Sequence, residues 1–244
     1  MATTIYTPTM LRGAGTRGVP EMSAGGGTSF SKYSLAFDGV DDYMSARGSG
    51  YPWWPYLTDA GACTMSFWIK SGVGVSGMRI LEKNLQFYII QSGTSTSIKY
   101  NIFTDTGYSV TGGAILDNEW HHCAMVYNGT TLEVFEDGVS VGSTSVTGTI
   151  PSSANYIYFG TYSGASHWLV GNLDDVAVFD SAKAIGDLWD GSGKPTDLSA
   201  ESGLVGYWLM GDGATFPTIP DDSPNSAPGT MIDMGAGDIV TDVP

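Results

Sequence analysis

Apolar residues alternate with polar or small residues over many short runs of this chain, which is the period-two pattern of half-buried β-strands. In one eight-residue run, Cys63, Met65, Phe67 and Ile69 share one face and Trp68 lies on the other. The same reasoning predicts further strands at 34–37, 43–44, 78–81, 85–91, 97–103, 108–110, 156–160, 173–179 and 204–210.

The clearest pattern runs from residue 120 to residue 141. Three alternating runs are separated there by Asn128-Gly129 and Asp137-Gly138. These dipeptides favour tight hairpin turns because both turn residues adopt positive φ. The segment therefore predicts a three-stranded antiparallel meander.

One short helix is expected at 182–189. Ser181 is suited to cap its first turn, and Ile185, Leu188 and Trp189 form an apolar stripe at helical spacing. The residues that follow, Gly-Ser-Gly-Lys-Pro, end it.

Length and composition fit one large all-β domain. The chain has 244 residues, 34 of them glycine, which suits short strands joined by tight turns. We expect an extended glycine-rich arm at 1–33, a β-sandwich at 34–210, and an acidic Gly/Pro-rich segment at 211–244 that completes or extends the sandwich. The two cysteines, Cys63 and Cys123, lie within apolar strand patterns and are interpreted as buried small hydrophobic residues rather than a disulfide.

Charge narrows the choice of partners. The net charge is −15, so we expect neither nucleic acid nor an anionic membrane surface as a partner. The first 33 residues are basic by contrast, with Arg12 and Arg17, so they form either an assembly arm that docks on a neighbouring copy or a leader whose charges are incidental. No signal peptide and no apolar run of membrane-spanning length is recognised, which favours a mature form or a virion component released by lysis.

Four segments together resemble a known family. They are Ser34–Tyr43 (SLAFDGVDDY), Thr64–Lys70 (TMSFWIK), Glu119–Gly138 with its Trp-His-His and Glu-Asp-Gly elements, and Gly171–Phe179 (GNLDDVAVF). In order and spacing they are similar to the laminin G-like branch of the concanavalin A-like lectin/glucanase superfamily. The resemblance implies a two-sheet antiparallel jelly-roll sandwich with one short helix.

A late segment, Gly203–Gly213, resembles a piece that in this family commonly precedes the opening strand. Here it comes last, so we hypothesise that it supplies that strand from the C-terminal end, paired within its own chain or with a neighbour. The arrangement also resembles lectin-like proteins of marine bacteriophages, which implies a capsid decoration or fibre protein.

Catalysis has little support. The family's retaining glucanases carry Glu-x-Asp-x-x-Glu on one strand, and the nearest string here is Glu133-Val-Phe-Glu-Asp137. Glu133 and Glu136 are three residues apart, so on a strand they point to opposite faces. His121 and His122 are expected to pack structurally, and we predict that the protein is not an enzyme.

Calcium is a possible ligand. The pairs Asp41-Asp42 and Asp174-Asp175 offer oxygen ligands, although aspartates at such positions also close turns. The stretch that matches the acidic calcium loop of the related pentraxins, 160–168, contains no acid.

Two aromatic loops are the candidate binding residues. Trp53, Trp54 and Tyr56 lie in a loop with two prolines, which exclude a central strand. A second set comes from a later loop and comprises Tyr162, His167 and Trp168. Each set either stacks on sugar rings, forms a subunit interface, or packs on the core.

The sequence thus predicts a non-catalytic, lectin-like binding or structural protein. We expect a virion component that self-associates or contacts other virion proteins, with a cell-surface glycan as a possible ligand. The alternatives are a free carbohydrate-binding adhesion module and, remotely, a glycoside hydrolase. Either way, the expected location is the virion or the extracellular space.

Overall fold

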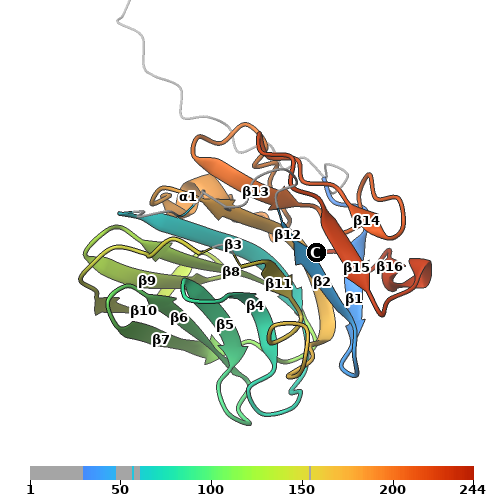
Figure 1. Cartoon of the computed structure of the whole chain (residues 1–244), viewed down its shortest axis with the longest axis horizontal. Helices are drawn as coiled ribbons and strands as arrows, with labels where there is room; N and C mark the ends of the chain where they lie inside the picture. The colour runs from blue at the N-terminus through green and yellow to red at the C-terminus, as the bar shows by residue number, and fades with distance from the viewer. Residues whose placement is uncertain (1–29, 48–56, 58–60, 154) are drawn as a thin grey trace, which may run out of the picture.

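The computed structural model describes residues 30–47, 57, 61–153 and 155–244 (Figure 1). The predicted sites Arg12, Arg17, Trp53, Trp54 and Tyr56 lie outside these residues. The described strands are β1 Ser34–Asp38, β2 Tyr43–Ala46, β3 Cys63–Lys70, β4 Arg79–Lys83, β5 Phe87–Gln91, β6 Ser97–Phe103, β7 Gly107–Ala114, β8 Trp120–Tyr127, β9 Thr131–Glu136, β10 Val139–Ser145, β11 Ile157–Phe159, β12 Val170–Phe179, β13 Leu204–Trp208, β14 Thr218–Ile219, β15 Gly229–Ile232 and β16 Ile239–Val240.

These strands form two antiparallel sheets, which confirms the predicted sandwich (Figure 1). Sheet A has the order β10-β9-β8-β3-β12-β1-β16, and β13 also pairs with β12. Sheet B has the order β14-β15-β2-β11-β4-β5-β6-β7. Neighbours such as β3 and β12 are far apart in sequence, so the sheets depend on long-range pairing.

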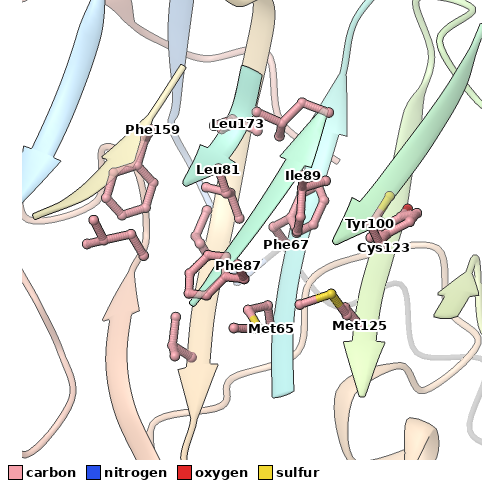
Figure 2. Close-up of a cluster of buried hydrophobic side chains, with 14 of the residues drawn as sticks. Met65, Phe67, Leu81, Phe87, Ile89, Tyr100, Cys123, Met125, Phe159 and Leu173 are labelled. Carbon is pink, nitrogen blue, oxygen red and sulfur yellow. The ribbon is translucent and has the colours of Figure 1, made fainter. Parts of the chain in front are cut away.

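The main core lies between the two sheets. Alternate residues of each strand point into it, which is why Phe87 and Ile89 are buried while Tyr88 between them is half-buried. The two cysteines are buried and free. The side chains at the centre of this layer are Met65, Phe67, Leu81, Phe87, Ile89, Tyr100, Cys123, Met125, Phe159 and Leu173 (Figure 2).

The meander formed by β8, β9 and β10 is confirmed, but only one of its turns has the expected backbone. At the second turn Asp137 and Gly138 both have positive φ, 48° and 75°. At the first turn only Gly129 does, and the connection has three residues. The Asn128 side chain explains the difference, because its oxygen accepts hydrogen bonds from the amides of Thr130 and Thr131 and stabilises a wider loop.

The predicted helix is shorter than the apolar stripe indicated. Helix α1 covers only Ile185–Leu188, and its N-cap is Ala184 without a side-chain bond. Ser181 is therefore not the cap; its carbonyl oxygen instead accepts the Thr64 hydroxyl of β3. The segment is held to the sheet by this contact rather than by helix propensity.

The C-terminal segment pairs within its own chain. Strand β13 lies against β12, the β14–β15 hairpin extends sheet B beside β2, and β16 pairs with β1 (Figure 1). Trp208 of β13 is fully buried, and its indole N–H donates to the Ala227 carbonyl at 3.1 Å. Residues from 204 onward thus contribute strands to both sheets.

Candidate functional site

The outer face of sheet B carries aromatic and charged side chains that no other element of the described chain covers completely. On β6, Ile98, Tyr100 and Ile102 point into the core, so Lys99 and Asn101 point outward. The same alternation places half-exposed aromatic side chains on the outer face of the neighbouring strands.

Strand register aligns these outward residues into one row across the sheet, which we call the central row. Tyr158 of β11 pairs with Ser45 on one side and with Glu82 on the other. Glu82 pairs with Tyr88 of β5, and Tyr88 pairs with Asn101 of β6. Residues from five strands therefore form one line perpendicular to the strands.

A pocket of about 290 Å³ opens beside this row, and we call it the Arg79 pocket. It is lined by Arg79, Glu82, Asn84, Leu85, Tyr88, Phe103 and Tyr162. The aromatic rings supply flat apolar surface, and the charged and amide groups supply hydrogen-bond donors and acceptors.

An ion pair organises the pocket. Arg79 Nε lies 2.9 Å from Glu82 Oε2, and the Ser163 hydroxyl donates to Glu82 Oε1 at 3.0 Å. The Arg79 guanidinium also lies over the rings of Tyr88 and Tyr162, at 4.3 and 5.0 Å from their centroids. Burial raises the pKa of Glu82 above its ordinary value, and the positive charge of Arg79 and the hydrogen bond from Ser163 partly offset this rise.

A second group of rings, which we call the aromatic strip, adjoins the pocket through Tyr158. Ring centroids are 6.0 Å apart between Trp168 and Tyr43, 6.3 Å between Tyr43 and Tyr158, and 5.9 Å between Tyr158 and Tyr156. Arg47 lies over Tyr156 at 5.0 Å. The strip ends in a cation that is exposed to solvent.

The predicted loop residues Tyr162, His167 and Trp168 are brought to this face. The amide of Tyr162 donates to the Ser166 carbonyl, and the amide of Arg79 donates to the His167 carbonyl, both at 2.8 Å. Tyr162 then lines the Arg79 pocket, with its ring 6.0 Å from that of His167. Trp168 joins the aromatic strip, so one loop serves both parts of the face.

The first aspartate pair lies at the β1–β2 turn. The Asp42 carboxylate accepts the amide of Asp38 at 3.0 Å, and Asp38 accepts the amide of Val40 at 2.8 Å. Carboxylate oxygens of Asp38, Asp41 and Asp42 lie within 4.8 Å of one another, which is the donor type that Ca²⁺ prefers. These aspartates close a turn and, among the described residues, are the group with the spacing to hold a hard cation.

The second pair, Asp174-Asp175, is buried and engaged in structure. Asp174 accepts the Ser31 hydroxyl at 2.6 Å, and Asp175 accepts the hydroxyl of Tyr207. Burial and mutual repulsion raise the pKa of Asp174, and burial raises that of Asp175. Asp174 thereby anchors the chain where it enters β1.

The remaining candidates for chemistry do not converge. Glu136 is buried and accepts the Tyr100 hydroxyl at 3.0 Å, whereas Glu133 accepts the Ser140 hydroxyl outside the core. The two carboxylates therefore lie on opposite faces of β9, as predicted. His121 binds Asp137 through Nδ1 at 2.7 Å, and His122 is buried with Nε2 2.9 Å from the Ser66 hydroxyl.

Comparison with known proteins identifies the family. A model described as the concanavalin A-like lectin/glucanases superfamily (Laminin_G_3) matches residues 38–184, more than half of the chain. The chain belongs to this superfamily. Comparison with curated proteins finds no match.

One solved structure shows the same fold as this superfamily member, and a second is similar over a smaller part. A Bacteroides ovatus protein to which carbohydrate binding has been ascribed aligns with TM-score 0.67 and 17% identity, over 88% of this chain and 61% of that one. This chain thus spans about three fifths of that protein. The CBM40 of a Ruminococcus gnavus IT-sialidase aligns with TM-score 0.49 and 10% identity, over 64% of this chain and 96% of its own.

Among the described residues, no helix has the length and apolar character needed to cross a membrane.

Sequence reasoning missed most of the face of this superfamily member. Arg79, Glu82, Tyr88, Tyr43 and Tyr158 were not singled out, because each lies inside a strand. The available signal was that Tyr88 and Tyr158 occupy the outward phase of their strands, flanked by Phe87 and Phe159 in the inward phase. Outward aromatic residues on several strands indicate a binding face, but their alignment depends on register.

Proposed function

We propose that this protein binds carbohydrate through the outer face of sheet B. The observation that carries the proposal is the Arg79 pocket, which combines the rings of Tyr88, Phe103 and Tyr162 with an organised ion pair. Sugars present apolar ring faces and planar arrays of hydroxyls, so they bind where aromatic surface and paired polar groups meet. The membership of a lectin-containing superfamily supports this proposal.

A glycan array with matched variants tests it. Tyr88→Ala removes one wall of the pocket, and Tyr33→Ala removes an exposed Tyr beside β1 of the other sheet. The wild type and Tyr33→Ala should give the same glycan signals, whereas Tyr88→Ala should lose at least tenfold in affinity. Equal signals for all three proteins would place the binding elsewhere.

We propose, second, that the protein assembles into a virion. In that case the glycan that it binds would lie on the surface of the host cell. It is supported by the basic composition of residues 1–33 and by the contacts at their end. Ser31 is tied to Asp174, and the amides of Lys32 and Tyr33 donate to Asp212 at 2.8 and 3.2 Å. Residues 31–33, the end of the predicted arm 1–33, are therefore fixed to the sandwich.

Light scattering after size-exclusion chromatography tests the assembly proposal. Full-length protein should form a defined oligomer, and a chain lacking residues 1–29 should be a monomer with unchanged glycan binding. If full-length protein is itself a monomer at every concentration, the arm is not an assembly device.

A further inference from the structure

The outer face of sheet B has a feature that a site for a single terminal sugar does not require, namely the length of its central row. Tyr158 and Tyr88 are both outward and are separated by one strand, β4. Adjacent strands lie about 4.8 Å apart, so the two rings are offset by roughly 10 Å across the sheet. This offset is close to the length of a disaccharide unit in a linear chain.

Between the two rings the row is polar. Glu82 pairs in register with both tyrosines and is held by Arg79 and Ser163. Asn101 follows Tyr88, but its amide group donates to the carbonyls of Tyr88 and Lys99, which fixes the row rather than leaving a donor for a ligand. The alternation of ring, polar group and ring matches a chain whose sugar faces and hydroxyl edges alternate along its length.

The charges of this face differ from those of the whole chain. The protein carries −15 overall, yet the strands of sheet B contain Arg79, Lys83 and Lys99 against one acid, Glu82, and exposed Arg47 follows β2. Glu82 is 2% exposed and paired with Arg79, so it presents little charge to solvent. Lys83 is buried as well, so two outward cations remain, Arg47 beside the aromatic strip and Lys99 beyond the Arg79 pocket, while Asp233 lies near Tyr43 at the edge of the strip.

Arg47 and Lys99 lie toward opposite corners of this face, on either side of the central row, because Lys99 pairs with Ile90 rather than with Tyr88 and Arg47 lies two residues beyond Ser45. Arg47 follows β2 and Lys99 belongs to β6, four strand positions apart in the order β2-β11-β4-β5-β6. Four spacings of about 4.8 Å place them roughly 19 Å apart across the sheet, and their opposite displacements along the strands add to this separation, so the line between them crosses the face diagonally. A ligand that reaches both cations must span the Arg79 pocket and the aromatic strip together.

We propose that the ligand of this face is a linear acidic polysaccharide, which crosses the strands of sheet B and is bound along several consecutive sugar units. This inference rests on the proposed carbohydrate binding and specifies its ligand class. Tyr158 and Tyr88 stack on sugar rings, Arg79 holds the unit in the pocket, and Arg47 and Lys99 attract acidic groups on either side.

The first test uses polymers of defined charge. Native affinity electrophoresis compares alginate and polygalacturonate, which are acidic, with mixed-linkage β-glucan and laminarin, which are neutral. The acidic polymers should retard the wild type and the neutral ones should not. Retardation by neutral polymers alone would overturn the inference while leaving carbohydrate binding intact, whereas failure of every polymer and of the glycan array would remove the proposed function itself.

The second test measures chain length by titration calorimetry with oligouronates of one to six units from the polymer that binds. Affinity should rise at least tenfold from one unit to four, and Tyr158→Ala should remove this rise while leaving the affinity for one unit. Tyr88→Ala should weaken all lengths, and Tyr33→Ala should change none. A single unit that binds the wild type as tightly as a hexamer would overturn the inference.

A third test measures the contribution of charge to affinity, with a variant that lacks the two outward cations and with added salt. The double variant Arg47→Gln with Lys99→Gln keeps every ring of the face, so its fold is checked by an unchanged melting temperature. Its affinity for the hexamer should fall about tenfold at 50 mM NaCl, and the wild type should lose a similar factor between 50 and 500 mM because exposed charges are screened. If the affinity for the hexamer depends neither on these two cations nor on the salt concentration, the proposal of an acidic ligand is wrong.

Discussion

The outer faces of both sheets carry aromatic side chains. These side chains are covered on sheet A and remain half-exposed on sheet B. On sheet A, Trp68 and His122 are covered by the segment that contains α1, with Trp189 packed 5.4 Å from both rings. On sheet B, Tyr43, Tyr158 and Tyr88 stay half-exposed. An outward aromatic residue on a strand is therefore accessible to a ligand only where no later segment covers it.

The covered face also has a small core of its own. Phe179, Leu188, Leu204 and Tyr207 are buried there, on the side of sheet A away from sheet B. We expect variants of the covered face to change stability and variants of the open face to change binding.

The largest effect is expected at Trp68, which is 4% exposed. Trp68→Ala removes a buried indole and should lower the free energy of unfolding by about 3–5 kcal/mol. Trp168→Ala is the matched change on the open face and should cost about 1 kcal/mol, because its ring is only partly buried. Urea unfolding of both variants measures the difference, and equal costs would contradict the division.

The second effect concerns pH. Burial lowers the pKa of His122 to about 4, from about 6.5 in an unfolded chain. The folded state thus holds this ring neutral, and the unfolded state takes up a proton first as the pH falls. Stability from this group is complete above pH 6.5 and decreases by about 3 kcal/mol toward pH 4.

The variant His122→Gln isolates that contribution. Other groups titrate in the opposite sense, since the raised pKa of Asp174 favours folding at low pH. The contributions of these other groups cancel when the free energy of unfolding of His122→Gln is subtracted from that of the wild type at each pH. This difference should change steadily between pH 6.5 and 4, and parallel curves would show that His122 is not held neutral.

A smaller effect is expected at Gly138. A Cβ on this residue would collide with the Trp189 ring, and its φ of 75° is unfavourable for other residues. Gly138→Ala should cost about 2 kcal/mol, from strain and displacement of the cover. Gly93 is the matched control, because it has a similar φ of 62° and a Cβ added there would meet no atom within 4 Å. The smaller loss of stability in Gly93→Ala therefore measures the backbone strain alone.

The smallest effect on stability is expected on the open face. Tyr158→Ala should cost about 1 kcal/mol or less, since it loses only half-buried ring contacts. Its effect on glycan affinity should be larger than its effect on the melting temperature. If Tyr158→Ala unfolds the protein instead, the ring is part of the core and not of a binding face.

Much of the fold could be predicted from the sequence because it depends on local patterns. Alternation located strands such as β3 and β6, and Asp137-Gly138 fixed the turn between β9 and β10. The helix length and the Asn128 loop were less predictable, since tertiary contacts of Ser181 and side-chain bonds of Asn128 decide them.

The candidate site was predictable only in part. Tyr162, His167 and Trp168 were singled out because they lie in a loop without strand periodicity, and their role in binding stays a prediction. Tyr158, Glu82 and Tyr88 were not, because they meet through register between strands that no local pattern specifies.

The most direct test of the central claim maps the binding face by nuclear magnetic resonance. Amide chemical shifts of labelled protein would be followed during titration with the oligosaccharide that gives the strongest glycan-array signal. We expect the largest changes on β2, β11, β4, β5 and β6, with none on the covered face around Trp68 and Trp189. Changes centred on sheet A, or no changes with any glycan that the array offers, would contradict it.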